Sequence, residues 1–367
     1  MSHLAQAGRS APSTGAEPPF EPTVRGAHAL VADLMRPRPA IYYADLAATA
    51  AIGWAALLAC AVLPPSPLAL LAFALAVLAF QRAASFIHEL AHLPAGAVPG
   101  LDTFWNVVFG IPMLLPSLLY VGGVHGVHHA KPHYGTTRDP EYLTIARWPR
   151  WRRALWLLHA GALPLALVVR FGALAPASIM HPRLRRWVWE RASSLAINSA
   201  FVRGPPPGDL RWRFRVQEAV SCAWVLALAV LVYRRAVPAR VVVVAAAVAA
   251  AVGILNQLRT IVSHRFVNTG DAPLTFEEQF LDSVNVPGHH VPTALWAPVG
   301  LRYHALHHLL PGLPYHALGA AHRRILGSIS AGAAYHRVNE PSLAAALRAL
   351  DRAAGGAGDA HVTAARG

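Results

Sequence analysis

The sequence predicts an all-α integral membrane protein built around two transmembrane helical hairpins, with four spans in all. Two observations lead to this prediction. The 367-residue chain is 55% hydrophobic and only 14% charged, whereas soluble domains are about a quarter charged. Its apolar residues also gather in long runs, and runs of this length are typical of membrane spans.

The first hairpin is predicted between residues 46 and 92. An apolar run from Leu46 to Leu63 ends at a group of prolines, which force a turn. A second run begins at Leu68 and stays compatible with a helix as far as a first group of histidines. Each run has about 20 residues, which at ~1.5 Å per residue matches the hydrocarbon thickness of a bilayer.

The apolar stretch 104–121 is long enough to span, but its position argues against it. It contains Pro112 and Pro116, and it separates the first group of histidines from the second. One crossing here would put these two groups on opposite faces of the membrane. If both bind the same metal centre, the stretch must be interfacial or re-entrant.

The segment 131–215 is rich in arginine, which is typical of cytoplasmic regions. Its apolar part, 154–169, is interrupted by His159 and Pro164 and is followed by Arg170. It is interpreted as a surface or in-plane helix. The second hairpin is predicted from apolar runs at 219–233 and 241–255. The arginines between these runs would lie outside, against the positive-inside rule.

The two ends of the chain are polar or rich in small residues. Residues 1–39 are expected to form a disordered cytoplasmic tail, 40–350 the membrane domain, and 351–367 a flexible C-terminal tail. The net charge of +14 can attract nucleic acid, but the arginines flank apolar segments, so no nucleic-acid partner is expected. Cys60 and Cys222 lie in apolar stretches and form no thiolate metal motif.

Three histidine clusters lie among these apolar segments: HELAH at 88–92, HGVHH at 125–129 and HALHH at 304–308. Spacings of three and four residues place their side chains on one face of a helix. Neutral imidazole is a common ligand of transition metals. Eight imidazoles exceed the four ligands of one tetrahedral zinc ion, so the clusters suit two ions. A cysteine-free, imidazole-rich site favours iron over zinc or copper.

Two alternatives remain open from the residues alone. HELAH matches the zinc-hydrolase pattern H-E-x-x-H, in which Glu89 would be the general base. A membrane haem protein with paired histidines is the second alternative. The two further H-x-x-H-H clusters and the membrane setting favour the di-metal interpretation.

The clusters and their flanking sequences resemble the three histidine boxes of the membrane fatty acid desaturase family. The flanking sequences are HHAKPHYGTTRDPEYL after the second cluster and NVPGHHVPTALWAPVGLRYHALHHLLPGLPYHALGAAHRRI around the third. The resemblance covers about residues 46–326, and it implies a cytoplasmic helical cap that holds a di-iron site against the two hairpins. The metal ligands that it implies are His88, His92, His125, His128, His129, His304, His307 and His308.

The resemblance implies a ninth ligand, His264, from the end of the fourth span. Some relatives carry an asparagine one turn earlier, where this chain has Thr260, so this part of the metal coordination departs from the family pattern. Asp139, Glu141 and Asp271 are candidates to orient a ligand imidazole by accepting a hydrogen bond.

The activity implied is desaturation of a lipid acyl chain with dioxygen as co-substrate. A lipid or carotenoid hydroxylase or ketolase is the alternative, because it would use the same ligands. The chain shows no haem, flavin or iron–sulfur motif of its own, so electrons are expected from a ferredoxin, rubredoxin or cytochrome. The expected location is a bacterial inner membrane, with the active site on the cytoplasmic side.

Overall fold

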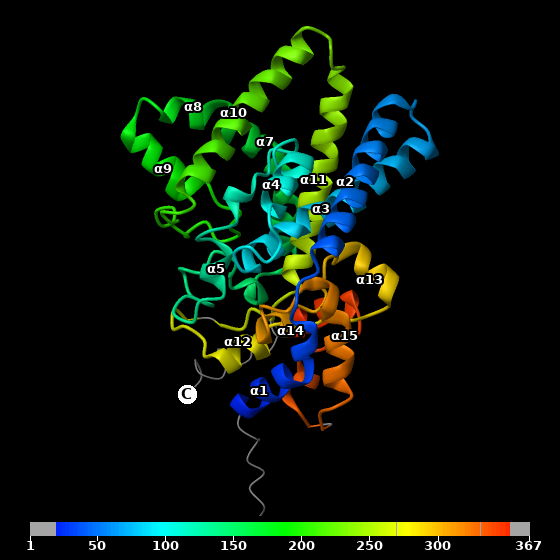
Figure 1. Ribbon diagram of the computed structural model, residues 1–367, viewed down its shortest axis with the longest axis vertical. Coiled ribbons are helices and arrows are strands. Elements are labelled where there is room, and N and C mark those ends of the chain that lie inside the picture. The colour runs from blue at the N-terminus through cyan, green and yellow to red at the C-terminus, as the bar shows by residue number, and fades with distance from the viewer. Residues whose placement is uncertain (1–19, 269, 331, 353–367) are drawn as a thin grey trace, which may run out of the picture.

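The computed structural model describes residues 20–268, 270–330 and 332–352. This part of the chain is helical, with turns and isolated β-bridges and no strands. Figure 1 shows the long helices α2, α3, α10 and α11 toward one end of the molecule and the short helices α12, α14 and α15 toward the other. The described chain contains five helical segments that are long and apolar enough to cross a membrane, which supports the predicted all-α membrane fold.

The first hairpin consists of α2 (Pro39–Val62) and α3 (Pro67–His92). Proline begins each helix, where its missing N–H costs nothing. The Ser66 hydroxyl caps α3 by accepting a hydrogen bond from the Ala69 N–H at 3.2 Å. The predicted turn therefore lies where the prolines place it, and α3 carries the first histidine cluster at its C-terminal end.

The second hairpin consists of α10 (Arg211–Tyr233) and α11 (Ala239–Ile261). Arg240, in the first turn of α11, has a structural role at the turn between the two helices. Its guanidinium donates to the backbone carbonyls of Cys60 and Leu63 at the C-terminus of α2. A helix C-terminus has carbonyls without helical partners and a partial negative charge. The arginine thus ties the outer ends of the two hairpins together.

The segment 150–178 is longer than the predicted in-plane helix at 154–169. It runs without a break through α6 (Arg150–His159), η5 (Ala160–Ala162), α7 (Leu163–Val169), η6 (Arg170–Leu174) and α8 (Ala175–Ser178). It is followed by the basic helix α9 (Pro182–Ala192). Arg170, which was expected to end the apolar part, is buried and paired with Glu218 of α10 at 2.5 Å. Because a carboxylate compensates the buried guanidinium, the helical segment continues past it.

The stretch 104–121 forms no long helix, in agreement with its interpretation as interfacial or re-entrant. It contains the end of α4 (Leu101–Trp105), η2 (Asn106–Gly110) and η3 (Ser117–Leu119). The Asn106 side chain donates to the Ser117 hydroxyl and accepts from the Ser117 N–H. These bonds satisfy buried polar groups where the helical backbone is interrupted.

The remaining helices are all shorter than the four helices of the hairpins. They are η4 (Ile145–Arg147), α5 (His125–His128), α12 (Phe276–Asp282), α13 (His290–Trp296), α14 (His304–Leu309), α15 (Tyr315–Leu326) and α16 (Ala334–Arg337).

Part of the predicted N-terminal tail is ordered as helix. Residues 1–19 and 353–367 lie outside the described chain, but α1 (Phe20–Val31) and η1 (Ala32–Leu34) pack against α15. Asp33 of η1 forms an ion pair with Arg324 of α15. Buried apolar side chains in α1, including Val31, explain why this part of the segment folds.

Glu89 joins the first hairpin to the short helices. One of its carboxylate oxygens accepts from the Tyr42 hydroxyl of α2 at 2.6 Å and from the Tyr315 N–H of α15 at 3.2 Å. All three residues are buried. A buried carboxylate is tolerated only where donors replace its lost water. Glu89 therefore points away from the histidines and holds α15 against α2 and α3.

We expect Tyr42→Phe to lower the free energy of unfolding by about 1–3 kcal/mol, because the buried Glu89 carboxylate loses a donor. The measurement is thermal unfolding of the purified protein in detergent. Tyr233→Phe is the matched control, since Tyr233 is 86% exposed. Equal unfolding midpoints for the two variants would show that this bond contributes nothing.

Candidate metal centre

The structure brings all nine predicted histidine ligands together in two groups. The first contains His88, His92, His125, His129 and His307, and the second contains His128, His264, His304 and His308. In each group the ligand atoms lie within 4.8 Å of one another. Ligands on opposite sides of one ion lie roughly 4.2 Å apart when each metal–nitrogen bond is about 2.1 Å. Each group can therefore hold a metal ion after small adjustments.

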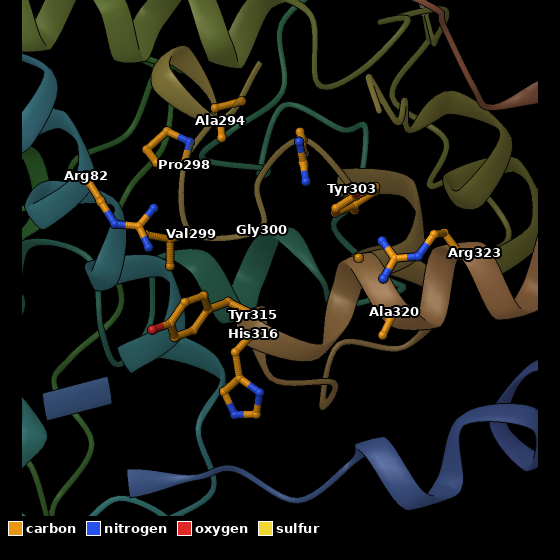
Figure 2. Close-up of a pocket in the computed structure, with 13 residues that line it drawn as sticks. Arg82, Ala294, Pro298, Val299, Gly300, Tyr303, Tyr315, His316, Ala320 and Arg323 are labelled. Carbon is orange, nitrogen blue, oxygen red and sulfur yellow. The ribbon is translucent and has the colours of Figure 1, made fainter. Parts of the chain in front are cut away.

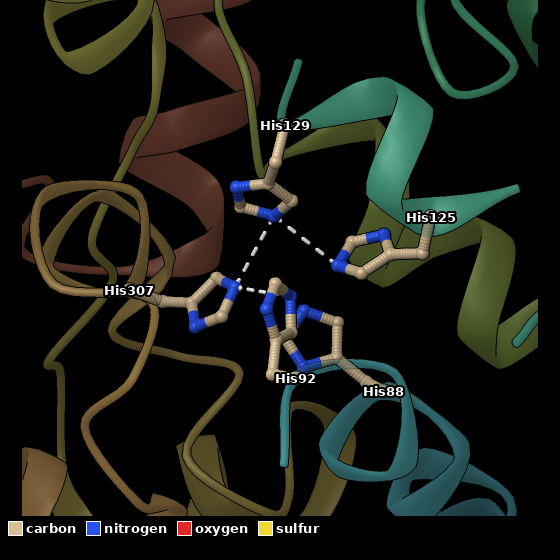
Figure 3. A group of neighbouring side chains, drawn as sticks. All are labelled: His88, His92, His125, His129 and His307. Carbon is tan, nitrogen blue, oxygen red and sulfur yellow. Dashed lines mark hydrogen bonds between the residues drawn. The ribbon is translucent and has the colours of Figure 1, made fainter. Parts of the chain in front are cut away.

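Four separate parts of the chain supply the ligands of the two groups: α3, residues 125–129, His264 and α14. Figure 3 shows the first group, in which the rings from α3, α5 and α14 point toward one another. Gly122 and Gly123, with φ of +66° and +97°, turn the chain directly before α5. Residues with a side chain rarely adopt this left-handed region, so the two glycines allow α5 to present its histidines here.

Short distances between ring nitrogens show how closely the imidazoles converge. The Nε2 atom of His307 lies 2.9 Å from that of His92 and 3.3 Å from that of His129. In the second group, the Nε2 atom of His304 lies 2.9 Å from that of His264 and 3.1 Å from that of His308. The Nε2 atoms therefore face the centres of the two groups.

Acidic side chains hold the outward-facing Nδ1 atoms. Glu141 lies 2.6 Å from Nδ1 of His125, and Asp139 lies 3.0 Å from Nδ1 of His128. A carboxylate at Nδ1 keeps the proton there and leaves the lone pair of Nε2 free for a metal. Two of the three acidic residues proposed from the sequence thus contact predicted ligands. Asp271 does not, because it accepts hydrogen bonds from Thr137 instead.

A tyrosine takes the same position at His264, and this contact is not among those predicted from the sequence. Nδ1 of His264 lies 2.8 Å from the hydroxyl of Tyr134, which donates to Asp282 at 2.9 Å. Tyr120 similarly contacts Nδ1 of His125 at 2.8 Å. Tyr134 stands inside the flanking sequence of the second cluster, but its distance from His264 along the chain hides the pairing.

Several of the buried nitrogens without partners belong to this site. Both ring nitrogens of His88, Nε2 of His128, and Nδ1 of His304 and His308 are buried and have no hydrogen-bond partner among the described residues. Buried polar atoms normally have partners, so these nitrogens call for an explanation. Metal ions bound between the imidazoles would use the Nε2 lone pairs and fix the ring tautomers, so the donor set fits transition-metal binding.

The protonation states suit this role. Burial lowers the pKa of His125, His304, His307 and His308 well below the ordinary value, so these rings are neutral at pH 7. Metal ligation requires neutral imidazole. Burial alone would also lower the pKa of His128, but the adjacent Asp139 carboxylate raises it instead.

A cavity of about 820 Å³ reaches the first histidine group. His88, Tyr120 and Glu141 line its inner end, and apolar side chains of α6, α7 and α11 line much of the rest. Thr260 also lines it; its hydroxyl donates to the Asn256 carbonyl at 3.0 Å. A cavity of this volume and character suits the apolar chain of a lipid.

A second cavity, of about 340 Å³, lies apart from the histidine ligands. Figure 2 shows Arg82 of α3 and Arg323 of α15 extending toward the loop that contains Val299 and Gly300. Leu301 of the same loop lines the larger cavity. None of the nine predicted ligands lines the smaller cavity.

The fold and the two histidine groups together define a membrane-embedded protein with a metal-binding centre. Residues 64–339 match the sequence pattern of the family described as "Fatty acid desaturase". A relative named ceramide hydroxylase, from Caulobacter vibrioides (strain NA1000 / CB15N), is 45% identical over 331 residues, which cover 89% of this chain and 93% of the relative. No solved structure matches the chain significantly.

The chain belongs to the fatty acid desaturase family, and it is an integral membrane oxidoreductase. The family resemblance predicted from the histidine clusters is confirmed. The prediction of acyl-chain desaturation is wrong, because the relative that matches almost the whole chain is a hydroxylase. The two reactions share their ligands and differ in whether oxygen is transferred to carbon, so the histidine pattern could not separate them.

We expect Asp139→Asn to weaken metal binding by about 10- to 100-fold, because the imidazole of His128 loses the carboxylate that orients it. The measurement is iron retained during titration with a chelator. Asp271→Asn is the matched control, because exposed Asp271 bonds only Thr137. If both variants retain iron as wild type does, the role of Asp139 is disproved.

Proposed function

We propose that this protein hydroxylates a ceramide-type lipid with dioxygen at two iron ions held by its nine clustered histidines. The observation that carries this proposal is the lipid-sized cavity whose inner end is lined by His88 of the first histidine group. Likeness to a ceramide hydroxylase over 89% of the chain supports the reaction and the lipid class.

Each part of the site has a definite task in this proposal. Bound iron would supply the dioxygen activation that an unactivated C–H bond requires. Overall, one C–H bond becomes C–OH while dioxygen, two electrons and two protons yield the alcohol and water. Asp139 and Glu141 hold ligand imidazoles in the tautomer that faces the metal. Trp156 and Leu163 help to line the apolar wall that excludes water from the bound chain.

A zinc hydrolase that uses Glu89 as base has no support in this geometry. The Glu89 carboxylate accepts from Tyr42 and from the Tyr315 N–H, and it belongs to neither histidine group. A general base must reach the water that it activates. Glu89 is committed to packing the hairpin against α15.

We propose that four helices cross the membrane and that segment 150–178 enters it without crossing. His128 and His264 lie in one group, with ring centroids 5.1 Å apart. The chain between them contains segment 150–178, α10 and α11. Three crossings would end on the opposite face, whereas the two crossings of α10 and α11 return the chain to the same face. The arginine-rich segment 131–215 supports a cytoplasmic location for that face, in a bacterial inner membrane.

Electrons must reach the site from another protein, since the chain carries no redox motif besides the histidines. We propose a ferredoxin, rubredoxin or cytochrome as donor. The net charge of +14 supports an acidic partner, because complementary charge speeds productive encounter.

We expect His307→Ala to abolish hydroxylation and to reduce bound iron, while membrane insertion stays intact. The measurements are the mass of ceramide extracted from expressing cells, where the product is heavier by one oxygen atom, and iron per purified chain. His336→Ala is the control, because His336 is exposed and outside both groups. Full activity in the His307 variant, or wild-type protein that contains zinc alone, would contradict the proposal.

Cavity volume gives an independent test. Ala249 of α11 lines the cavity, whereas Ala247 of the same helix is exposed and does not. We expect Ala249→Phe to reduce turnover of long-chain ceramide by about tenfold or more, because overpacking typically costs 1–3 kcal/mol, with bound iron unchanged. Ala247→Phe should act as wild type. If Ala249→Phe turns over long chains normally, the cavity is not where the lipid binds.

A further inference from the structure

Arg259, near the end of α11, is a buried cation with partners only in its own helix and the turn that follows. Arg259 is only 9% exposed. The guanidinium donates to Oδ1 of Asn256 at 3.2 Å, to Oγ1 of Thr260 at 3.0 Å and to Oγ of Ser263 at 3.4 Å. Within the described chain, no aspartate or glutamate forms an ion pair with it.

This arrangement leaves hydrogen-bonding capacity unused. A guanidinium carries five N–H donors in a fixed fork, and three hydrogen bonds do not fill them. Burying a charge without full compensation is costly. Arg170, a buried arginine of segment 150–178, instead has a carboxylate partner in Glu218. Each guanidinium nitrogen of Arg259 thus has one partner, and two of its five N–H groups remain available to a further acceptor.

The unused donors lie at the end of the cavity where the histidines are. Arg259 lines the large cavity together with His88 and Glu141. Ser85, Asn256 and Thr260 add polar groups to the same wall.

Polar groups at this position argue against a purely apolar chain beside the metals. Leu155, Leu163 and Leu167 line the cavity along α6 and α7, where an alkyl chain would lose its contact with water. An alkyl chain beside Arg259 would instead remove water from a guanidinium without giving it an acceptor. The inner end of the cavity thus suits a part of the substrate that carries oxygen.

The acceptor is better neutral than anionic. The Glu141 carboxylate and the Arg259 guanidinium both line this part of the cavity. The charge of Arg259 is therefore already partly balanced within the site, and a second anion would be repelled by Glu141. A carbonyl oxygen accepts from two guanidinium N–H groups without adding charge.

We infer that Arg259 donates hydrogen bonds to the amide carbonyl of the lipid head and so places the oxidised carbon within a few bonds of the amide. This inference rests on the proposed function for the identity of the lipid. It makes Arg259 a positioning residue, and the alkyl tail then runs outward along α6 and α7.

The inference is tested by equilibrium binding to the iron-loaded protein in detergent, without reductant. Trp148 and Trp156 line the cavity, so quenching of tryptophan fluorescence reports occupancy. The two probes are a short-chain ceramide and an ether analogue, in which O–CH₂ replaces the N–H and the carbonyl. We expect Arg259→Met to raise the Kd of the ceramide by about tenfold or more, as for the loss of a hydrogen bond to a charged group, and to leave the Kd of the ether unchanged.

The matched control is Arg215→Met, because Arg215 is exposed on α10 and does not line the cavity. It should bind both probes as wild type does. If Arg259→Met does not accumulate as folded protein, Arg259→Gln is compared in the same way, with the same selective loss expected. Equal losses for the two probes, or no loss for ceramide, would overturn the inference.

Failure of the proposed function gives a different result. Wild-type protein that binds ceramide in an Arg259-dependent way but forms no hydroxylated product when reduced would contradict hydroxylation and leave the role of Arg259 intact. Normal hydroxylation with no Arg259-dependent binding would contradict the role of Arg259 and leave the proposed function intact.

Discussion

The convergence of nine imidazoles, seven of them buried, is the constraint on which the rest of the structure depends. Each ring must present one nitrogen inward, and at His125, His128 and His264 a carboxylate or tyrosine fixes the other nitrogen. Those partners lie in the chain after the second cluster and in α12, so their contacts with the imidazoles hold these segments in place. The same convergence requires the ends of α3 and α11 to lie side by side, which sets how the two hairpins pack.

Much of this arrangement could be predicted from local sequence. The hairpins follow from the lengths of the apolar runs and from the prolines before Ser66, and the histidine groups follow from spacings of three and four. Segment 150–178 could not be delimited, because the partner that neutralises Arg170, Glu218, lies 48 residues further along the chain. Tyr134 and Asp282 were missed for the same reason, since they lie 130 and 18 residues from His264.

The outcome of the reaction is a property of the cavity more than of the ligands. Desaturases and hydroxylases can share one histidine pattern, so the clusters specify the chemistry of oxygen activation but not the fate of the substrate carbon. In the proposed function, the cavity wall with Ser85, Thr260 and Arg259 would position the lipid. Thr260 stands in this wall, and its hydroxyl donates to the backbone of its own helix.

Residues 125–129 and α14 each contribute histidines to both groups, and this has a consequence for assembly. The segment 125–129 gives His125 and His129 to one group and His128 to the other, while α14 gives His307 to one and His304 and His308 to the other. Neither metal position can be built without placing helices that also build its neighbour. Metal binding at one position therefore orders helices that the other position also needs, which lowers the entropy cost of binding there. The empty and doubly loaded forms should dominate, with singly loaded protein scarce during biogenesis.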